Sequence, residues 1–209
     1  TVDQKQLPTL LIHLRKKMTL VNNIDDLRNI GYENLLDFSL YLPNSESSET
    51  LFKSLKITRT LPGKRISCIG QWQGKNIFAK FFISPNRAET HWHKEKKGFQ
   101  LLTEKKILAP KVLHAGKHFQ DEVYFILYEF IENATDLKPV WENASAPHQL
   151  QLLQQLTSTV AKHHKQGIIQ QDLHLNNFLI ANNQFYTLDG ADIAEVDCSN
   201  KKIAFIGPF

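Results

Sequence analysis

Three residues with oxygen-bearing side chains lie close together near the C-terminal end of the chain. Asp172 and Asn177 stand five positions apart in the segment Gln170–Asn177, and Asp189 follows after a short apolar stretch. A carboxylate can accept the proton of a hydroxyl group, and carboxylate and amide oxygens are ligands that suit Mg²⁺. Phosphoryl transfer needs one carboxylate at the acceptor hydroxyl, together with an Asn and a second carboxylate that hold Mg²⁺ against nucleotide phosphates. The residue types and their spacing therefore indicate phosphoryl transfer chemistry.

Local sequence signals predict the elements that position these three residues. Apolar periodicity favours a helix over residues 146–166, and Gly167 is suited to end it. We expect a loop over residues 170–177, which carries Asp172 and Asn177. The runs 178–181 and 184–188 then predict a hairpin whose turn is Asn182-Asn183, because Asn tolerates the left-handed backbone of such turns.

The middle of the chain predicts strands and one helix. Lys80 lies near the end of the third expected strand, and Glu95 lies on the helix that follows it. A lysine after the apolar run Ile77-Phe78-Ala79 favours burial beside a phosphate over a solvated strand end. Glu89 competes with Glu95 as the partner of Lys80, and we favour Glu95. The expected elements are strands over 56–61, 66–72, 76–82 and 123–131, a helix over 86–106 and a turn region over 114–118.

The first part of the chain differs in character from the rest. Leu7, Leu10, Leu11, Leu14 and Met18 recur at helical spacing, and a second helix is expected over residues 25–42. Pro43 and the polar run 44–49 then indicate a linker. We therefore predict three parts: a helical extension and linker over 1–49, a strand-rich lobe over 50–132 and a helical lobe over 133–209.

This arrangement resembles the protein-kinase-like superfamily, over about residues 56–197. The resemblance implies an α+β, two-lobed fold with a helical N-terminal extension and a short C-lobe, and it implies ATP and Mg²⁺ as cofactors. It places Asp172 at the catalytic Asp, and Asn177 and Asp189 at the two metal ligands. Lys80, held by Glu95, would contact the nucleotide phosphates. The backbone around Glu129 and Ile131, after a long strand, would bind adenine.

Several positions depart from the protein kinase pattern. Gln170 and Gln171 replace the usual His and Arg, His174 stands where Lys is usual, and Asp189-Gly190-Ala191 lacks the usual Phe. The turn Pro62-Gly63-Lys64 has far fewer glycines than the usual phosphate-covering loop. Asp-Leu-His-x-x-Asn is typical of small-molecule and sugar kinases of this superfamily.

The segment 105–116 and the paired acids Asp189 and Asp192 are similar to the bacterial lipopolysaccharide kinases. That resemblance implies transfer of the γ-phosphate to a sugar hydroxyl (Kdo or heptose) of the lipopolysaccharide inner core. It also implies a cytoplasmic protein with peripheral contact at the cytoplasmic face of the inner membrane. Asp192 is open to two interpretations, as a third acidic group near the metal or as a cap or turn residue.

Three alternatives stay open on the same residues. The first is another small-molecule kinase, of the aminoglycoside or choline type, and the second is a protein Ser/Thr kinase, which His174 disfavours. The third is a pseudokinase that binds nucleotide without transferring phosphate. The glycine-poor turn at residues 62–64 favours the pseudokinase, whereas the presence of the core residues argues against it.

Composition narrows the classes further. Lys and Arg exceed Asp and Glu by 25 to 21, a net charge of +4 that does not indicate nucleic acid but allows contact with phosphate, anionic lipid or an acidic glycan. Cys68 and Cys198 are too few for a disulfide framework and predict reduced thiols in a cytosolic protein. The pairs His91/His93 and His163/His164 lack the Cys or carboxylate ligands that would complete a zinc site.

Overall fold

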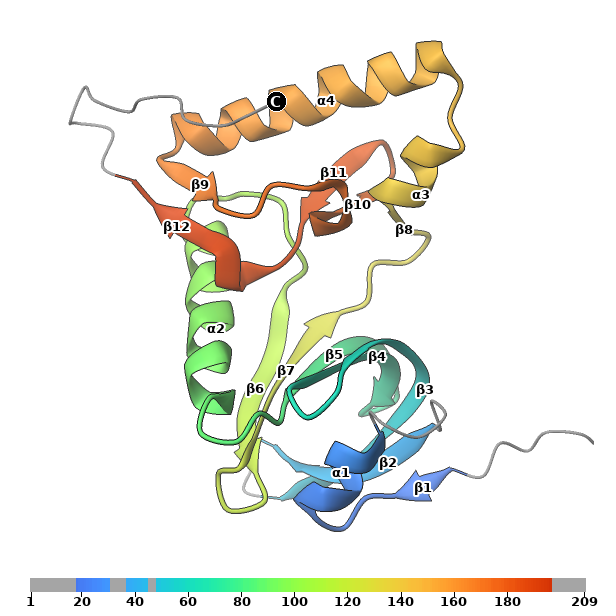
Figure 1. Ribbon diagram of the computed structural model, residues 1–209, viewed down its shortest axis with the longest axis vertical. Coiled ribbons are helices and arrows are strands. Elements are labelled where there is room, and N and C mark those ends of the chain that lie inside the picture. Colours follow the sequence, from blue (N-terminus) through green and yellow to red (C-terminus); the bar gives the residue numbers. More distant parts are fainter. Residues whose placement is uncertain (1–17, 31–36, 45–47, 197–209) are drawn as a thin grey trace, which may run out of the picture. The chain divides into compact units, whose positions relative to one another are not determined.

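The protein is a mixed α+β chain that divides into two compact units (Figure 1). A computed structural model describes residues 18–30, 37–44 and 48–196. The first unit comprises Thr1–Ala88 and Gly116–Phe125, and the second comprises Glu89–Ala115 and Ile126–Phe209. The α+β class expected from the sequence is confirmed. The predicted domain division at residues 49 and 132 stays a prediction.

The main sheet has seven strands in the order β1-β2-β3-β4-β5-β7-β6. β1 pairs with β2 in parallel, and the pairs from β2 to β5 are antiparallel hairpins. β6 and β7 each continue from one unit into the other. The bounds are β1 Thr19–Leu20, β2 Phe38–Pro43, β3 Glu49–Leu61, β4 Arg65–Trp72, β5 Lys75–Phe82, β6 Val112–His118 and β7 Val123–Glu129.

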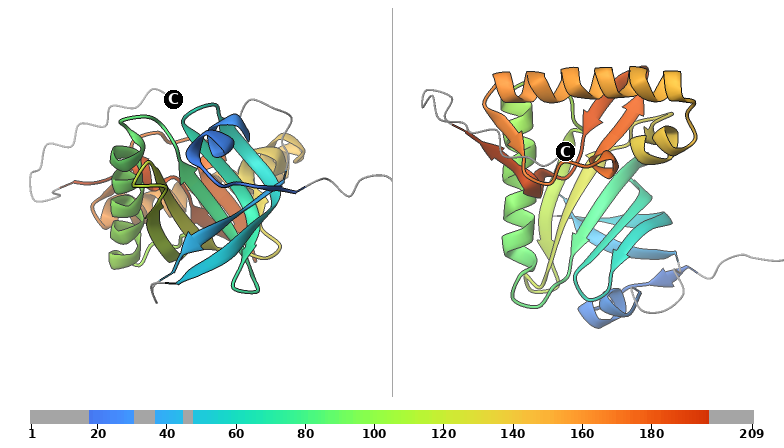
Figure 2. Two further views of the ribbon diagram at one scale, coloured as in Figure 1. Left: turned by 90° about the horizontal axis from the view of Figure 1, so that it is seen from below. Right: turned by 45° about the horizontal axis from the view of Figure 1, so that its top comes forward.

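An aromatic cluster forms the core of the first unit. Phe38, Phe52 and Phe81 meet with ring centroids 5.3–5.9 Å apart, and Phe125 lies 6.3 Å from Phe81. Helix α1 (Ile24–Ile30) lies beside the strands of this unit, where Arg28 Nε donates to Ile83 O at 3.2 Å (Figure 2). Cys68 is a free thiol in this core, and burial raises its pKa above the usual range.

The sequence predicts one helix over residues 25–42. This prediction is confirmed over residues 25–30, which belong to α1, and is wrong over residues 38–42, which form a strand. Residues 38–43 form strand β2, because Phe38, Leu40 and Leu42 alternate with Ser39 and Tyr41 at the period of a strand. β2 pairs with β3 from Ser39↔Lys53 to Pro43↔Glu49, so the polar run predicted as a linker connects two paired strands. The first predicted helix lies outside the described residues, apart from Met18.

The second unit contains the helices α2, α3 and α4 and two small sheets. Its sheets are β11-β10-β8 and β12-β9, and all pairs within them are antiparallel. The bounds are α2 Ala88–Glu104, which begins one residue before the unit, β8 Thr135–Asp136, α3 Leu137–Glu142, α4 Ala146–Lys165, β9 Ile168–Gln170, η1 Leu175–Asn177, β10 Phe178–Ala181, β11 Gln184–Thr187, η2 Gly190–Asp192 and β12 Ile193–Glu195.

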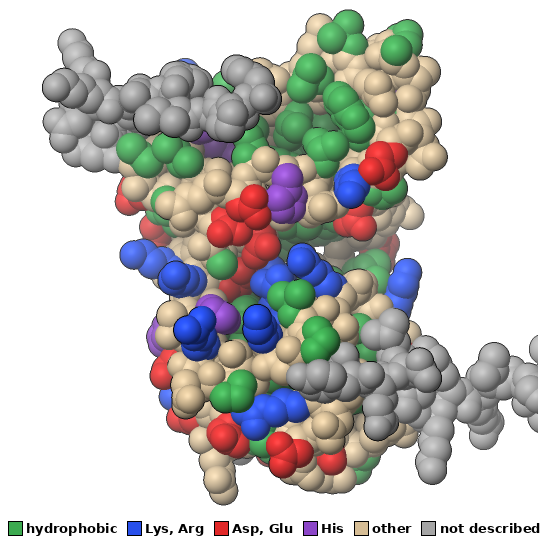
Figure 3. Space-filling view, viewed as in Figure 1, with side chains coloured by type: hydrophobic (Ala, Val, Ile, Leu, Met, Phe, Trp, Pro, Cys, Tyr) green, Lys and Arg blue, Asp and Glu red, His purple; other side chains and the backbone are tan. Residues whose placement is uncertain are grey.

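Helix α4 packs across the β10–β11 hairpin (Figures 1 and 2). Leu152 of α4, Leu137 of α3, and Phe178 and Phe185 of the hairpin form one buried cluster. Burial of such side chains stabilises the unit by about 1.5–3 kcal/mol each. Apolar side chains also reach the surface above α3 and α4 (Figure 3), and Leu150 of α4 is 56% exposed.

Most of the other predicted helices and strands are confirmed, and one predicted turn is wrong. The strands expected over 66–72, 76–82 and 123–131, the helices over 86–106 and 146–166, and the hairpin after residue 178 are confirmed within a few residues. The turn region expected over 114–118 is wrong, because these residues belong to β6, a half-exposed strand at the edge of the sheet. No described helix is long and apolar enough to cross a membrane.

Candidate functional site

Two hydrogen-bonded loops of the second unit carry the residues that the sequence singled out. The first loop leaves β9 and contains Asp172 and Asn177, and the second joins β11 to β12 and contains Asp189. Leu188 N donates to Asn177 O at 2.8 Å, and Gln171 N donates to Asp192 O at 2.8 Å. β9 also pairs with β12, from Gln170↔Ile193 to Ile168↔Glu195. The backbone therefore holds the two loops side by side.

Asn177 ties its own side chain to the backbone of Asp172. Its Nδ2 donates to Asp172 O at 2.8 Å, and Asn177 is buried, with only 4% of its surface exposed. The single-turn helix η1, in which Asn177 N donates to His174 O at 3.0 Å, brings the two residues together. Because the amide nitrogen is used in this bond, the amide oxygen is the atom that can ligate a cation.

The carboxylate of Asp172 reaches solvent. Its Oδ2 lies 3.2 Å from His174 Nε2, with side-chain exposures of 64% for Asp172 and 41% for His174. An exposed pair of this kind contributes little to stability, about 0–1 kcal/mol, and only when the imidazole is protonated. The carboxylate is thus accessible to a substrate, and His174 is its neighbour.

Asp189 has a left-handed backbone, with φ +61° and ψ +73°. This conformation is uncommon outside glycine, although Asp tolerates it better than most residues, and such strain clusters at functional sites. It reverses the chain between β11 and the single-turn helix η2, where Asp192 N donates to Asp189 O at 3.3 Å. The backbone of Asp192 therefore belongs to this turn, and the interpretation of its carboxylate as a third acidic group near the metal stays a prediction.

Glu95 of α2 fixes the position of the loop that follows Asp189. It is fully buried, its Oε1 accepts from Tyr128 Oη at 3.0 Å, and its Oε2 accepts from Ala191 N at 3.1 Å. A buried carboxylate needs such donors, since burial without them is costly. Glu89, the competing residue, lies on the surface, where it faces His93 at 3.6 Å.

Tyr128 was not predicted to belong to the site, and its role can be tested. We expect Tyr128→Phe to lower the free energy of unfolding by about 1–2 kcal/mol, because buried Glu95 loses one donor. Urea unfolding measures this change. Tyr186→Phe is the control, since the Tyr186 hydroxyl makes no hydrogen bond with the described residues. Equal stability of wild type and Tyr128→Phe would contradict this role.

The predicted nucleotide-binding residues lie on β5 and at the end of β7. Lys80 stands on β5 of the first unit, opposite Ser67, and its pairing with Glu95 stays a prediction. Glu129 ends β7, where its Oε1 accepts from Lys111 N at 3.0 Å and its backbone N donates to Lys111 O at 2.9 Å. Ile131 follows the strand, and its carbonyl accepts from Ala134 N at 3.3 Å.

Gln170 and His163 contact the segment that leads into the Asp189 loop, and no local sequence pattern indicates either contact. Gln170 Nε2 donates to Leu188 O at 3.2 Å, so it ties β9 to the loop before Asp189. Its Oε1 is buried and has no partner among the described residues. His163 Nε2 lies 3.4 Å from Thr187 Oγ1, two residues before Asp189.

The burial of His163 predicts a loss of stability in acid. Burial, followed by the neighbouring His164, lowers the pKa of His163 from 6.5 to about 4. Below pH 6.5 the unfolded chain therefore binds a proton that the folded chain does not, so stability falls as the pH decreases towards 4. Between pH 7 and pH 5 we expect this residue to cost about 2 kcal/mol.

Urea unfolding of the full chain at pH 7 and pH 5 checks this expectation. His163→Gln should remove that part of the acid dependence, whereas His148→Gln, at an exposed position of the same helix, should keep the dependence of the wild type. An unchanged dependence in His163→Gln would rule out His163 as its source.

The oxygens of Asn177 and Asp189 are the groups of this site that suit a magnesium ion. Mg²⁺ typically uses one or two protein oxygens and completes its coordination with water and substrate phosphates. Among the described residues no three His, Cys, Asp or Glu side chains form a cluster that could hold a metal by themselves.

Comparison with known proteins does not assign the chain to a family. No family model matches the chain, and no curated protein matches it either. The functional argument therefore rests on the residues of the site and on their geometry.

Proposed function

We propose that the protein is an ATP- and Mg²⁺-dependent phosphotransferase of the two-lobed, protein-kinase-like kind, with an alcohol group as acceptor. The observation that carries the proposal is the bond from Asn177 Nδ2 to Asp172 O, at 2.8 Å, in a loop that backbone hydrogen bonds tie to the loop of Asp189. This bond joins the expected base to an expected metal ligand.

The residues of the second unit divide the work of such a reaction. The exposed carboxylate of Asp172 orients the acceptor hydroxyl and accepts its proton. The oxygens of Asn177 and Asp189 hold the cation, and the left-handed turn at Asp189 sets the direction of its side chain. When bound, Mg²⁺ supplies charge neutralisation at the nucleotide phosphates. Catalysis then rests on positioning and electrostatic stabilisation.

Nucleotide binding is assigned to residues around β5 and β7. We propose that Lys80 contacts the phosphates and that Glu95 holds Lys80, while the backbone at Glu129 and Ile131 binds adenine. Glu95 suits this role because its buried carboxylate is already oriented by Tyr128 and by Ala191 N. The backbone N of Glu129 is used by Lys111 O, which assigns the adenine contact at this residue to the carbonyl.

The acceptor that we propose is a sugar hydroxyl of the lipopolysaccharide inner core, at the cytoplasmic face of the inner membrane. This choice depends on the similarity of Asp172-Leu173-His174 and of residues 105–116 to sugar kinases. The exposed His174 beside Asp172 supports it, because an imidazole at this point can hydrogen-bond a neighbouring hydroxyl.

Transfer of labelled γ-phosphate tests the proposal directly. The full chain is incubated with labelled ATP and Mg²⁺ and offered lipopolysaccharide core extract, an aminoglycoside, choline or a generic protein, with Asp172→Asn as the control. Label in the lipopolysaccharide alone, absent with the variant, is the expected result. Label in another acceptor would support the proposed phosphoryl transfer but show that the proposed acceptor is wrong. If nucleotide binds but no acceptor is labelled, the proposed enzyme activity is wrong, and the result favours a nucleotide-binding pseudokinase.

A further inference from the structure

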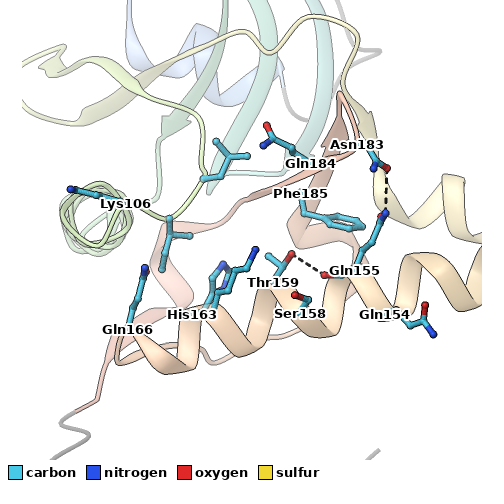
Figure 4. Close-up of a pocket in the computed structure, with 13 residues that line it drawn as sticks. Lys106, Gln154, Gln155, Ser158, Thr159, His163, Gln166, Asn183, Gln184 and Phe185 are labelled. Carbon is cyan, nitrogen blue, oxygen red and sulfur yellow. Dashed lines mark hydrogen bonds between the residues drawn. The ribbon is translucent and has the colours of Figure 1, made fainter.

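A second concave site lies in the second unit, away from the residues proposed for phosphoryl transfer. It is a pocket of about 620 Å³ lined by α4, the β10–β11 hairpin and the segment that follows α2 (Figure 4). None of its lining residues is Asp172, Asn177, Asp189 or Glu95. A pocket of this volume is large enough for a small-molecule ligand.

Amide and hydroxyl side chains make up more than half of the lining residues, although apolar atoms supply the larger part of the pocket surface. Gln155 and Thr159 point from α4 towards Asn183 and Phe185 of the hairpin, and Gln155 Nε2 donates to Asn183 Oδ1 at 3.4 Å (Figure 4). Thr159 donates its hydroxyl proton to Gln155 O at 3.0 Å, which leaves its oxygen as an acceptor for a ligand. Amide groups both donate and accept, as hydroxyl groups of a ligand also do. These side chains can therefore bind the hydroxyl groups of a ligand.

The charged groups of the lining are all basic. Lys106 and Lys162 line the pocket, and no Asp or Glu does. Neither lysine forms an ion pair with a carboxylate of the described residues. Lys162, with no carboxylate beside it in the lining, favours an anionic ligand and disfavours an amine or a metal ion.

An apolar wall completes the pocket. Ile107 and Phe185 are both buried but contribute to the lining, next to Leu108. One apolar wall opposite polar groups matches a sugar ring, which presents C–H bonds on its face and hydroxyls at its edge. The three kinds of lining residue therefore point to one class of ligand.

We propose that this pocket binds a sugar that carries an acidic group. Lys162 contacts the acidic group, Gln155 and Asn183 bind the hydroxyls, and Phe185 packs against the ring. This binding site does not depend on phosphoryl transfer. It would stand if the proposed enzyme activity proved wrong.

Isothermal titration calorimetry on the full chain, without nucleotide, tests the site with four probes. These are glucose 6-phosphate, glucuronic acid, glucose and inorganic phosphate. We expect saturable binding of at least one acidic sugar below about 1 mM, and binding of glucose and of phosphate at least roughly tenfold weaker. The two acidic sugars distinguish a phosphate from a carboxylate as the recognised group.

Matched lysine variants locate the binding. Lys162→Ala should weaken binding of the acidic sugar roughly tenfold or more, whereas Lys165→Ala should leave it unchanged. Lys165 belongs to the last turn of the same helix and does not line the pocket, so both variants remove one charge from α4. The proposal is overturned if no probe binds, if glucose or phosphate alone binds as tightly as the acidic sugars, or if both variants behave alike.

Discussion

Asp172→Asn is expected to lower the rate of phosphoryl transfer by at least about 100-fold, while nucleotide affinity changes little. Removal of a general base typically costs a factor of about 10²–10⁴. The substitution keeps the size of the side chain, and the hydrogen bond from Asn177 goes to the backbone carbonyl of Asp172, so the loop keeps this bond. Single-turnover transfer of labelled phosphate and nucleotide titration measure the two quantities separately.

The exposure of Asp172 makes this prediction specific to chemistry. Its carboxylate is 64% exposed and contacts His174, so the variant should unfold at the same urea concentration as the wild type. Asp136→Asn, at another exposed carboxylate of the second unit, is the control and should retain full transfer. If Asp172→Asn transfers phosphate as fast as the wild type, Asp172 is not the general base, even if the proposed fold is correct.

The sequence predicted best those elements whose signals are local. The α4 helix, with Gly167 after its end, and the hairpin around Asn182-Asn183 depend on periodicity and on turn residues that act over a few positions. Both asparagines and Gly167 have positive φ, as these signals require. The loop between these elements, which carries Asp172 and Asn177, was predictable for the same reason.

Elements and contacts that depend on distant partners were not predictable in this way. β9 and β12 have three residues each, and only their mutual pairing makes them strands. The apolar run of β2 is so short that helical and strand spacing both fit it, and pairing with β3 decides between them. The bond from Tyr128 to Glu95 spans 33 positions, and no local pattern indicates it.

The same holds for the close approach of two glycines behind the Asp189 loop. A Cβ added at Gly98 of α2 would lie 1.8 Å from Gly190 O, and one added at Gly190 would lie 2.4 Å from Glu95 O. Both neighbours are backbone atoms, which cannot move aside as a flexible side chain can. The absence of side chains at these two positions therefore lets α2 contact the loop, and lets Glu95 reach Ala191 N.

Gly98→Ala is accordingly expected to destabilise the protein by more than about 3 kcal/mol, at or beyond the upper end of the usual cost of overpacking. Helix propensity alone predicts the opposite sign, because Ala in a helix interior is better than Gly by about 0.8–1 kcal/mol. Urea unfolding separates the two, with Gln100→Ala at an exposed position of α2 as the control. A stabilised Gly98→Ala would mean that the helix does not contact the loop.

If the variant stays folded at low temperature, transfer activity gives a second measurement. The helix can admit the new methyl group only by moving away from Gly190, which lengthens the bond between Glu95 Oε2 and Ala191 N. The loop after Asp189 then loses its buried anchor, so transfer should fall even under conditions where most molecules are folded. Loss of stability with full activity per folded molecule would show that the anchor serves the fold and not the position of Asp189.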